Sequence, residues 1–250
     1  MLTSRDETTF RKPLRDHSVM LPHLLRSGIF SQSKKTATDK RPLPNHDDIS
    51  DTSRGGSVSC RGGTLLQTDM RVLLGLMKRA GGLPYTDATL DFGAKDFLEG
   101  IGRVLSTEAV RSLLNSLLTL STVTLVVKHY ENWSGHTFRF VNKVSWEKRQ
   151  FRVTLSPELR HAFDSLGRTY MPLTVRNRLT DGVQTALADA IYATSAGSFD
   201  VEALANVFGR EPNEYGRELR KAMPKLVAAG VLTSWSATRG RIHVERARLN

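Results

Sequence analysis

Apolar residues recur at every third or fourth position in several segments of the chain, which is the spacing of helices that bury one face. The clearest case ends the chain, where Leu219, Met223 and Leu226 define one stripe and Gly230 follows as a helix stop. This spacing predicts helices over residues 69–79, 94–101, 106–120, 179–194, 200–208 and 213–229. A short helix is also predicted over residues 156–165, where a Ser-Pro-Glu turn places proline in the first turn. Thr68, Ser106 and Asp200 are the predicted N-caps.

Segments of β-type residues follow the third and the last of these helices. The predicted strands cover residues 123–128, 137–141, 150–155, 231–235 and 242–246. Helices followed by strands is the order of a winged helix, a variant of the helix-turn-helix, and this order occurs twice. We therefore expect an α+β fold, mostly helical, with two tandem winged-helix domains.

Polar segments set the expected domain limits. Residues 1–18 are charged and aperiodic, and are predicted to form a flexible arm. Domain 1 is expected over residues 19–155, with a weakly ordered polar loop at about 34–61, and domain 2 over residues 156–250.

The charge balance favours a polyanionic partner. Lys and Arg number 36 against 25 Asp and Glu, which gives a net charge of +11 and a pI of about 10.1. Such a field raises the encounter rate with nucleic acid, although charge that only keeps the protein soluble is the plainer alternative. The single cysteine, Cys60, excludes an intramolecular disulfide and a zinc cluster of several thiolates, and a reducing cytoplasm is expected. No segment resembles a membrane span or a signal peptide.

Basic side chains gather off the apolar stripe of the last helix and in the turn that follows it. A helix with a basic outer face beside a basic hairpin is typical of a major-groove reader flanked by phosphate contacts. The candidate DNA-binding residues here are Arg217, Arg220, Lys221, Lys225, Arg239, Arg241, Asn213 and Tyr215. Alternatively, the outer face is only solvated, with Glu214 and Glu218 as ion-pair partners, and Asn213 is a helix cap.

The first domain offers weaker candidates. The helix at 106–120 exposes Arg111 and Asn115, and Lys128 lies on the strand that follows. Its weakly charged face suits either phosphate contacts or a protein interface, and the sequence leaves both open. Arg139 and Lys143 are further candidates for phosphate contacts.

No enzymatic motif was found. The seven histidines form neither a His-x-His pair nor a His-Glu-x-x-His run, and no phosphate-binding glycine loop or Gly-x-Ser-x-Gly is present. We therefore expect binding without chemistry, no cofactor and no metal. The rival from another class is an origin-nicking enzyme that would use Tyr130, Tyr170 or Tyr192 as its nucleophile.

From residue 21 to its end the chain resembles the TrfA-like plasmid replication initiators, which belong with the iteron-binding Rep proteins. The segments that carry the resemblance are LRSGIF at 25–30, GTLLQTD at 63–69, TDG at 180–182 with IYAT at 191–194, and LVAAGV at 226–231 before Trp235. One departure is Pro224, which lies inside the predicted recognition helix and is expected to kink it.

The resemblance implies a function as well as a fold. It implies that two winged-helix domains bind repeated duplex sites, called iterons, at a plasmid origin in the bacterial cytoplasm. It further implies local duplex opening, recruitment of the host replicative helicase and its loader, and a homodimer with a regulatory role. A winged-helix transcription regulator that acts as an autorepressor is the alternative within the same fold.

Overall fold

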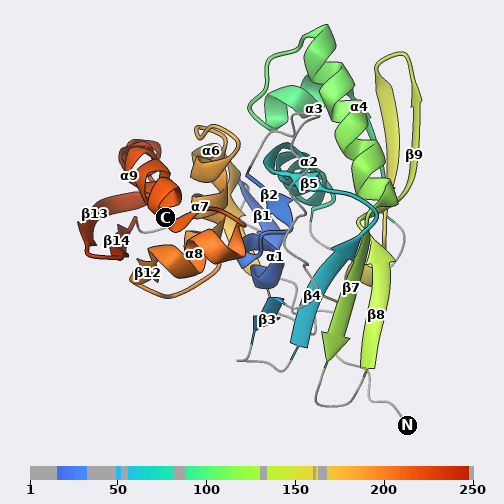
Figure 1. Cartoon of the computed structure of the whole chain (residues 1–250). Coiled ribbons are helices and arrows are strands. Elements are labelled where there is room, and N and C mark those ends of the chain that lie inside the picture. Colours follow the sequence, from blue (N-terminus) through green and yellow to red (C-terminus); the bar gives the residue numbers. More distant parts are fainter. Residues whose placement is uncertain are drawn as a thin grey trace, which may run out of the picture.

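Hydrophobic side chains of the computed structural model gather in two cores. The structure describes residues 16–32, 49–51, 56–81, 88–129, 134–159, 162 and 168–247. The larger core contains residues from Val19 to Leu173, and the smaller contains residues from Leu179 to Ile242. We call the two parts the N-terminal unit and the C-terminal unit (Figure 1). The sequence analysis predicted a domain boundary between residues 155 and 156. Leu159 and Met171 nevertheless belong to the larger core, so the boundary between the two cores lies between residues 173 and 179.

The first described residues belong to the folded body. Strand β1 (His17–Met20) pairs antiparallel with β11 (Thr169–Pro172), and the Ser18 hydroxyl donates to the Leu74 carbonyl at 2.8 Å. The expected arm at 1–18 is therefore wrong for its last three residues, 16–18, and residues 1–15 lie outside the described residues. Short elements continue the chain: α1 (Pro22–Arg26), then β2 (Phe30–Ser31), which pairs in parallel with β5 (Leu65–Leu66).

The N-terminal unit is built on three helices and a three-stranded sheet. In chain order these are α2 (Gln67–Arg79), β6 (Ala88–Gly93), α3 (Ala94–Gly100), α4 (Thr107–Thr122), β9 (Val141–Glu147) and β10 (Gln150–Leu155). The sheet order is β6-β10-β9, antiparallel throughout. The predicted cap at Ser106 is confirmed, because its hydroxyl accepts from the Ala109 amide at 3.0 Å. The predicted cap at Thr68 is wrong. The Asp69 carboxylate instead caps the start of α2 by accepting a hydrogen bond from the Leu66 amide at 2.7 Å.

A second sheet interrupts this unit between α4 and β9. It contains β7 (Thr124–His129) and β8 (Ser134–Arg139), joined to β4 (Gly56–Arg61) and β3 (Ile49–Asp51) in the order β3-β4-β7-β8. The sequence predicted three strands after α4, but the first two lie in this second sheet, where β7 pairs with β8. Only β10 pairs with β6, and β9 pairs with the other edge of β10. The polar loop expected at about 34–61 ends in strand β4, while residues 33–48 and 52–55 lie outside the described residues.

The C-terminal unit repeats the same order of elements. Junction helix α6 (Leu173–Arg176) leads into α7 (Val183–Tyr192), β12 (Ser198–Asp200), α8 (Val201–Val207), α9 (Pro212–Ala229), β13 (Leu232–Thr238) and β14 (Arg241–Arg246). Its sheet order, β12-β14-β13, matches β6-β10-β9 element for element. The predicted cap at Asp200 is confirmed, since its carboxylate accepts from the Ala203 amide at 2.9 Å.

Helix α9 follows the predicted pattern closely. Leu219, Met223 and Leu226 are fully buried, and Gly230 ends the helix with φ of 86°, a left-handed conformation that glycine adopts without strain. The helix continues through Pro224 to Ala229, so the proline does not end it.

The fold is mixed α/β, with extensive strands as well as helices, so the expectation of a mostly helical body is not confirmed. The short strands β6 and β12, which each precede a short helix, account for part of the difference.

Candidate nucleic-acid interface

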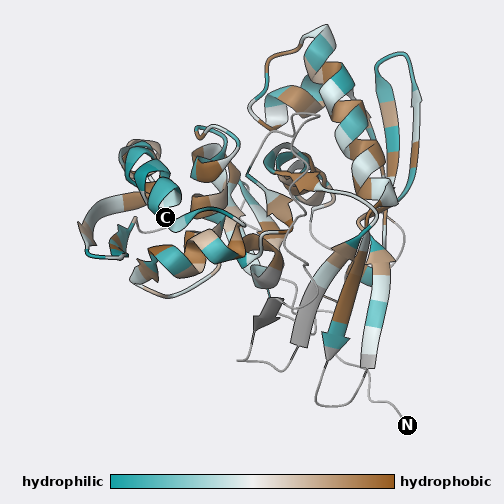
Figure 2. Cartoon of the chain, in the orientation of Figure 1, coloured by the Kyte–Doolittle hydropathy of each residue, from teal (hydrophilic) through white to brown (hydrophobic). Residues whose placement is uncertain are grey.

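One face of α9 carries the basic side chains that the sequence singled out. Arg217, Arg220, Lys221 and Lys225 are exposed, while the opposite face is buried against α7 and the β13–β14 hairpin. Figure 2 shows the visible side of α9 as largely hydrophilic. The amphipathic period thus separates core from basic surface by placing them on opposite sides of one helix.

A groove of about 170 Å³ runs between the first half of α9 and the β13–β14 hairpin. Asn213, Arg217 and Arg220 line it from the helix, and Gly240 and Arg241 line it from the hairpin turn. None of the described residues that line this groove is acidic. The fold therefore brings together the two basic segments that the sequence predicted to act together.

The remaining candidates of this unit flank the groove. Lys221 and Lys225 lie further round and along α9, and Arg239 is exposed in the hairpin turn beside Gly240. Glu218, which the sequence offered as a partner for the basic face, instead pairs with Arg210 at 2.6 Å. In the described part of the chain, no carboxylate pairs with Arg217 or Arg220, so their charges face solvent.

Two of the predicted roles on α9 are wrong. Tyr215 is 0% exposed, and its hydroxyl accepts from the Gln32 side-chain amide at 2.8 Å. Burial raises the pKa of this phenol, and the ring has no access to a duplex. Asn213 is not a cap, because Glu211 occupies the N-cap position and Pro212 begins the helix. Asn213 is exposed and lines the groove instead.

The candidates of the N-terminal unit are dispersed. Arg111 and Asn115 lie exposed on α4. Lys128 is half-buried near the far end of β7, in the inserted sheet rather than in the sheet that packs with α4. Arg139 closes β8 in the same inserted sheet. The structure therefore does not join these residues into one surface.

The topology exposes a second basic hairpin that the sequence interpretation missed. Strands β9 and β10 correspond to β13 and β14, and their turn carries Lys148 and Arg149, both exposed, with Lys143 further along β9. Lys148 adopts φ of 56°, consistent with its place in a tight turn. The only sequence signal was the charged run at 147–149 between two alternating β-type segments.

Residues that the sequence considered for chemistry are scattered. Tyr192 is half-buried, and burial raises the pKa of its phenol, whereas Tyr170 lies on β11 at 36% exposed. Tyr130 lies outside the described residues. Cys60 is half-buried on β4, and burial raises the pKa of its thiol. Among the described ranges, no three His, Cys, Asp or Glu residues gather as metal ligands would.

Helices of the described segments are too short or too polar to cross a bilayer.

Neither a protein-family model nor a curated protein matches this sequence. Solved structures do match it. Domains 2 and 3 of RctB, as a selenomethionine derivative, align with a TM-score of 0.58 and 12% identity, over 91% of this chain and 99% of that one. A second structure of RctB domains 2–3 aligns with a TM-score of 0.59 and 11% identity, over 90% of this chain and 96% of that one. At this identity the likeness establishes a shared fold.

Proposed function

We propose that the protein binds duplex DNA sequence-specifically and acts as a replication initiator, without chemistry of its own. The observation that carries the proposal is the groove between α9 and the β13–β14 hairpin, which three arginines line and no described acidic residue shares. A helix beside a two-stranded hairpin matches the major groove in size and places cations at the flanking phosphates.

The order of elements in each unit supports a winged-helix interpretation: a first helix, a short strand, two further helices and a hairpin that pairs with the short strand. In the C-terminal unit α9 is the recognition helix and β13–β14 the wing. In the N-terminal unit α4 and β9–β10 hold the corresponding places. The likeness to RctB, a replication initiator with winged-helix domains, supports the same class for this chain.

The two units offer different contacts to DNA. Arg217 and Arg220 suit bidentate hydrogen bonds to guanine, while Arg239 and Arg241 on the wing suit phosphates or the minor groove. On the N-terminal unit, Lys148 and Arg149 give the wing a positive tip, whereas the exposed face of α4 carries Arg111 beside Glu108. We infer that the C-terminal unit supplies most base discrimination and the N-terminal wing supplies phosphate contacts.

We further propose, from the resemblance to TrfA-like initiators, that the targets are tandem repeats at an origin. Binding there would assist opening of the adjacent duplex and recruitment of the host helicase and its loader, within the bacterial cytoplasm. A homodimer would regulate the process.

Selection of duplexes from a random-sequence library by the purified chain tests the binding proposal. We expect a recurring sequence, and a gel-shift affinity for it that falls steeply between about 50 and about 200 mM salt, because phosphate contacts release counterions. Equal affinity for the selected and a random duplex at every salt concentration would refute sequence-specific binding.

The same groove also suits a transcription regulator, so a second experiment separates the two functions. Deletion of the gene should abolish maintenance of the replicon that carries it if the protein is an initiator. Maintenance that persists, together with derepression of a promoter that holds the selected sequence, would favour the autorepressor.

A further inference from the structure

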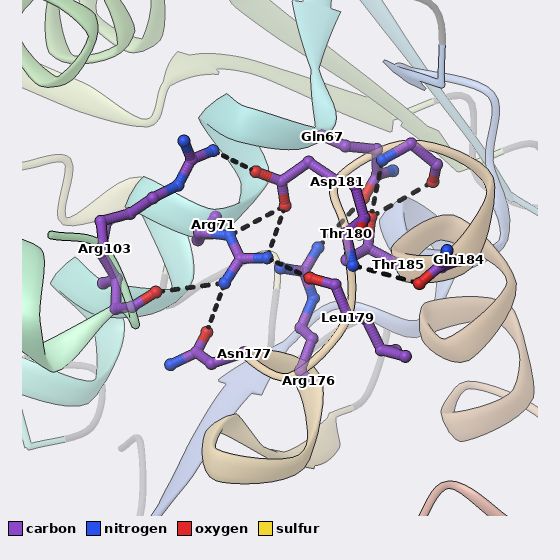
Figure 3. Close-up of polar contacts among 12 residues, drawn as sticks. Gln67, Arg71, Arg103, Arg176, Asn177, Leu179, Thr180, Asp181, Gln184 and Thr185 are labelled. Carbon is purple, nitrogen blue, oxygen red and sulfur yellow. Dashed lines mark hydrogen bonds and ion pairs between the residues drawn. The ribbon is translucent and has the colours of Figure 1, made fainter. Parts of the chain in front are cut away.

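A buried charged side chain joins the two units. Arg71 on α2 is 4% exposed, and its guanidinium donates to four acceptors (Figure 3). These are Asp181 Oδ1 at 2.8 Å, Asn177 Oδ1 at 3.0 Å, and the carbonyl oxygens of Leu179 at 2.9 Å and Ile101 at 3.1 Å. Three of the four acceptors belong to the segment between α6 and α7, which leads into the C-terminal unit.

Asp181 receives a second arginine from the N-terminal unit. Arg103, in the turn between α3 and α4, forms an ion pair with the other oxygen of the same carboxylate. Gly102 in that turn lies so close to the junction that an added Cβ would be 2.9 Å from Asn177 Cβ. One carboxylate, 10% exposed, thus holds both α2 and the turn that leads into α4.

A second buried pair lies on the same path. Arg176 is 0% exposed and binds both oxygens of Asp189 on α7 at 2.8 Å each, while its Nη2 donates to Gln67 Oε1 on α2 at 3.0 Å. Burial opposes the charge, but the Asp189 carboxylate outweighs it and raises the pKa of Arg176. Helix α2 is therefore bonded at two separate points, to α6 through Gln67 and to the segment between α6 and α7 through Arg71.

These bonds connect the helices that carry the two DNA-binding faces. Asp69 on α2 accepts from the Ser116 hydroxyl of α4 at 2.6 Å, and α7 packs against α9 in the smaller core. Apolar packing is non-directional, whereas multidentate charged contacts satisfy their geometry in one arrangement only. The hairpins β9–β10 and β13–β14 lie on opposite sides of the molecule in Figure 1, so this arrangement sets the separation of the two wings.

We propose that Arg71 and Asp181 are positioning residues that hold the two units in one orientation, so that the protein selects duplex sites by the spacing between two contacts. The DNA part of this inference rests on the proposed function. A change of about five base pairs, half of a ~10.5 base-pair turn, would move the second contact to the opposite face of the duplex.

The orientation is tested without DNA by double electron–electron resonance. Spin labels are placed at Ser145→Cys on β9 and Ser236→Cys on β13, both exposed, in a Cys60→Ser background. We expect a narrow distance distribution for the labelled parent and a clearly broader one for Asp181→Asn. Arg103→Ala removes one partner of Asp181 at a more exposed position, so it should broaden the distance distribution less. This variant replaces Asp181→Asn if that variant fails to fold.

The matched control is Asp91→Asn, which removes the exposed Asp91–Arg152 ion pair within one sheet of the N-terminal unit. Its distribution should stay as narrow as that of the parent. An unchanged width in both Asp181→Asn and Arg103→Ala would overturn the inference, because apolar packing alone would then fix the orientation.

The DNA arm uses a duplex that the wild-type chain selects from a random-sequence library. We expect a site with two contacted blocks, and a loss of about 100-fold in affinity when five base pairs are inserted between them. Asp181→Asn should bind the original duplex more weakly but lose little on insertion. A wild-type chain that tolerates the insertion would refute selection by spacing, while its sequence-specific binding would still uphold the proposed function. Absence of any selected sequence would refute the proposed function and leave the spin-label result to decide the orientation.

Discussion

At the scale of single residues, two arginines on one face of α9 are expected to discriminate between base sequences. Both Arg217 and Arg220 line the groove and face no described carboxylate partner. Replacing either by alanine removes hydrogen bonds to base edges, which contribute roughly 1–3 kcal/mol each. We expect affinity for the selected duplex to fall about ten- to a hundredfold in fluorescence anisotropy, and affinity for random duplex to fall much less.

Arg178→Ala is the control for this pair, because Arg178 is exposed and does not line the groove. The affinity of Arg178→Ala for the selected duplex should match that of the wild-type protein. If Arg217→Ala and Arg220→Ala weaken specific and random binding in parallel, these arginines contact phosphates and the assignment to bases is wrong.

The wing arginine belongs to a different class of contact. Arg239 is exposed in the β13–β14 turn, where a phosphate or minor-groove contact is expected. Arg239→Ala should lower affinity for all duplexes alike and reduce the slope of log affinity against log salt by about one. A salt slope that remains unchanged in a titration series would argue against a phosphate contact.

Tyr215 shows how burial changes a residue's role. Its hydroxyl is hydrogen-bonded to Gln32 inside the protein, so Tyr215→Phe should cost about 1 kcal/mol in the free energy of unfolding in urea. Affinity of the folded variant for DNA should not change. Tyr170→Phe, at an exposed tyrosine, should leave both quantities unchanged. A selective loss of DNA affinity in Tyr215→Phe would contradict the buried role.

At the scale of elements, Pro224 is expected to lower the stability of helix α9. Pro224 lacks the amide that would bond to the Arg220 carbonyl, at about 3 kcal/mol in a regular helix interior. Proline also restricts the unfolded chain, which offsets up to about 1 kcal/mol. Pro224→Ala should therefore raise the free energy of unfolding by about 2 kcal/mol in urea denaturation, and a lower urea midpoint would show that the proline stabilises the fold.

Local signals predicted helices better than sheets. The stripes of α4 and α9 and the caps at Ser106 and Asp200 are local in sequence, and the structure confirms them. Strand pairing is non-local, so the sequence assigned β7, β8 and β10 to one group and missed β6. Helical spacing also placed Tyr215 outside the stripe, although contacts with Gln32 and Phe208 bury it. The sequence did not indicate the roles of Arg71 and Arg176, because their partners Asp181 and Gln67 lie more than a hundred residues away along the chain.

At the scale of the whole molecule, the junction between the units is expected to govern stability as well as orientation. The side chains of Arg71 and Asp181 are 5% and 10% exposed, and removing one partner of a buried pair leaves an unpaired charge. Asp181→Asn should lower the free energy of unfolding by about 3–5 kcal/mol. Asp91→Asn removes an exposed ion pair and should lower the free energy of unfolding much less. Calorimetric unfolding of both variants measures the two losses. Equal losses in the two variants would contradict a special role for the junction.

Site-specific photo-crosslinking is the decisive test of whether the face of α9 that borders the groove contacts duplex DNA. A photoreactive amino acid replaces Asn213, which lines the groove, or Asn206, which is exposed on α8 away from it. We expect irradiation with the selected duplex to yield a covalent protein–DNA adduct from position 213 and little from position 206. Adducts of equal yield from the two positions, or none from position 213, would contradict it.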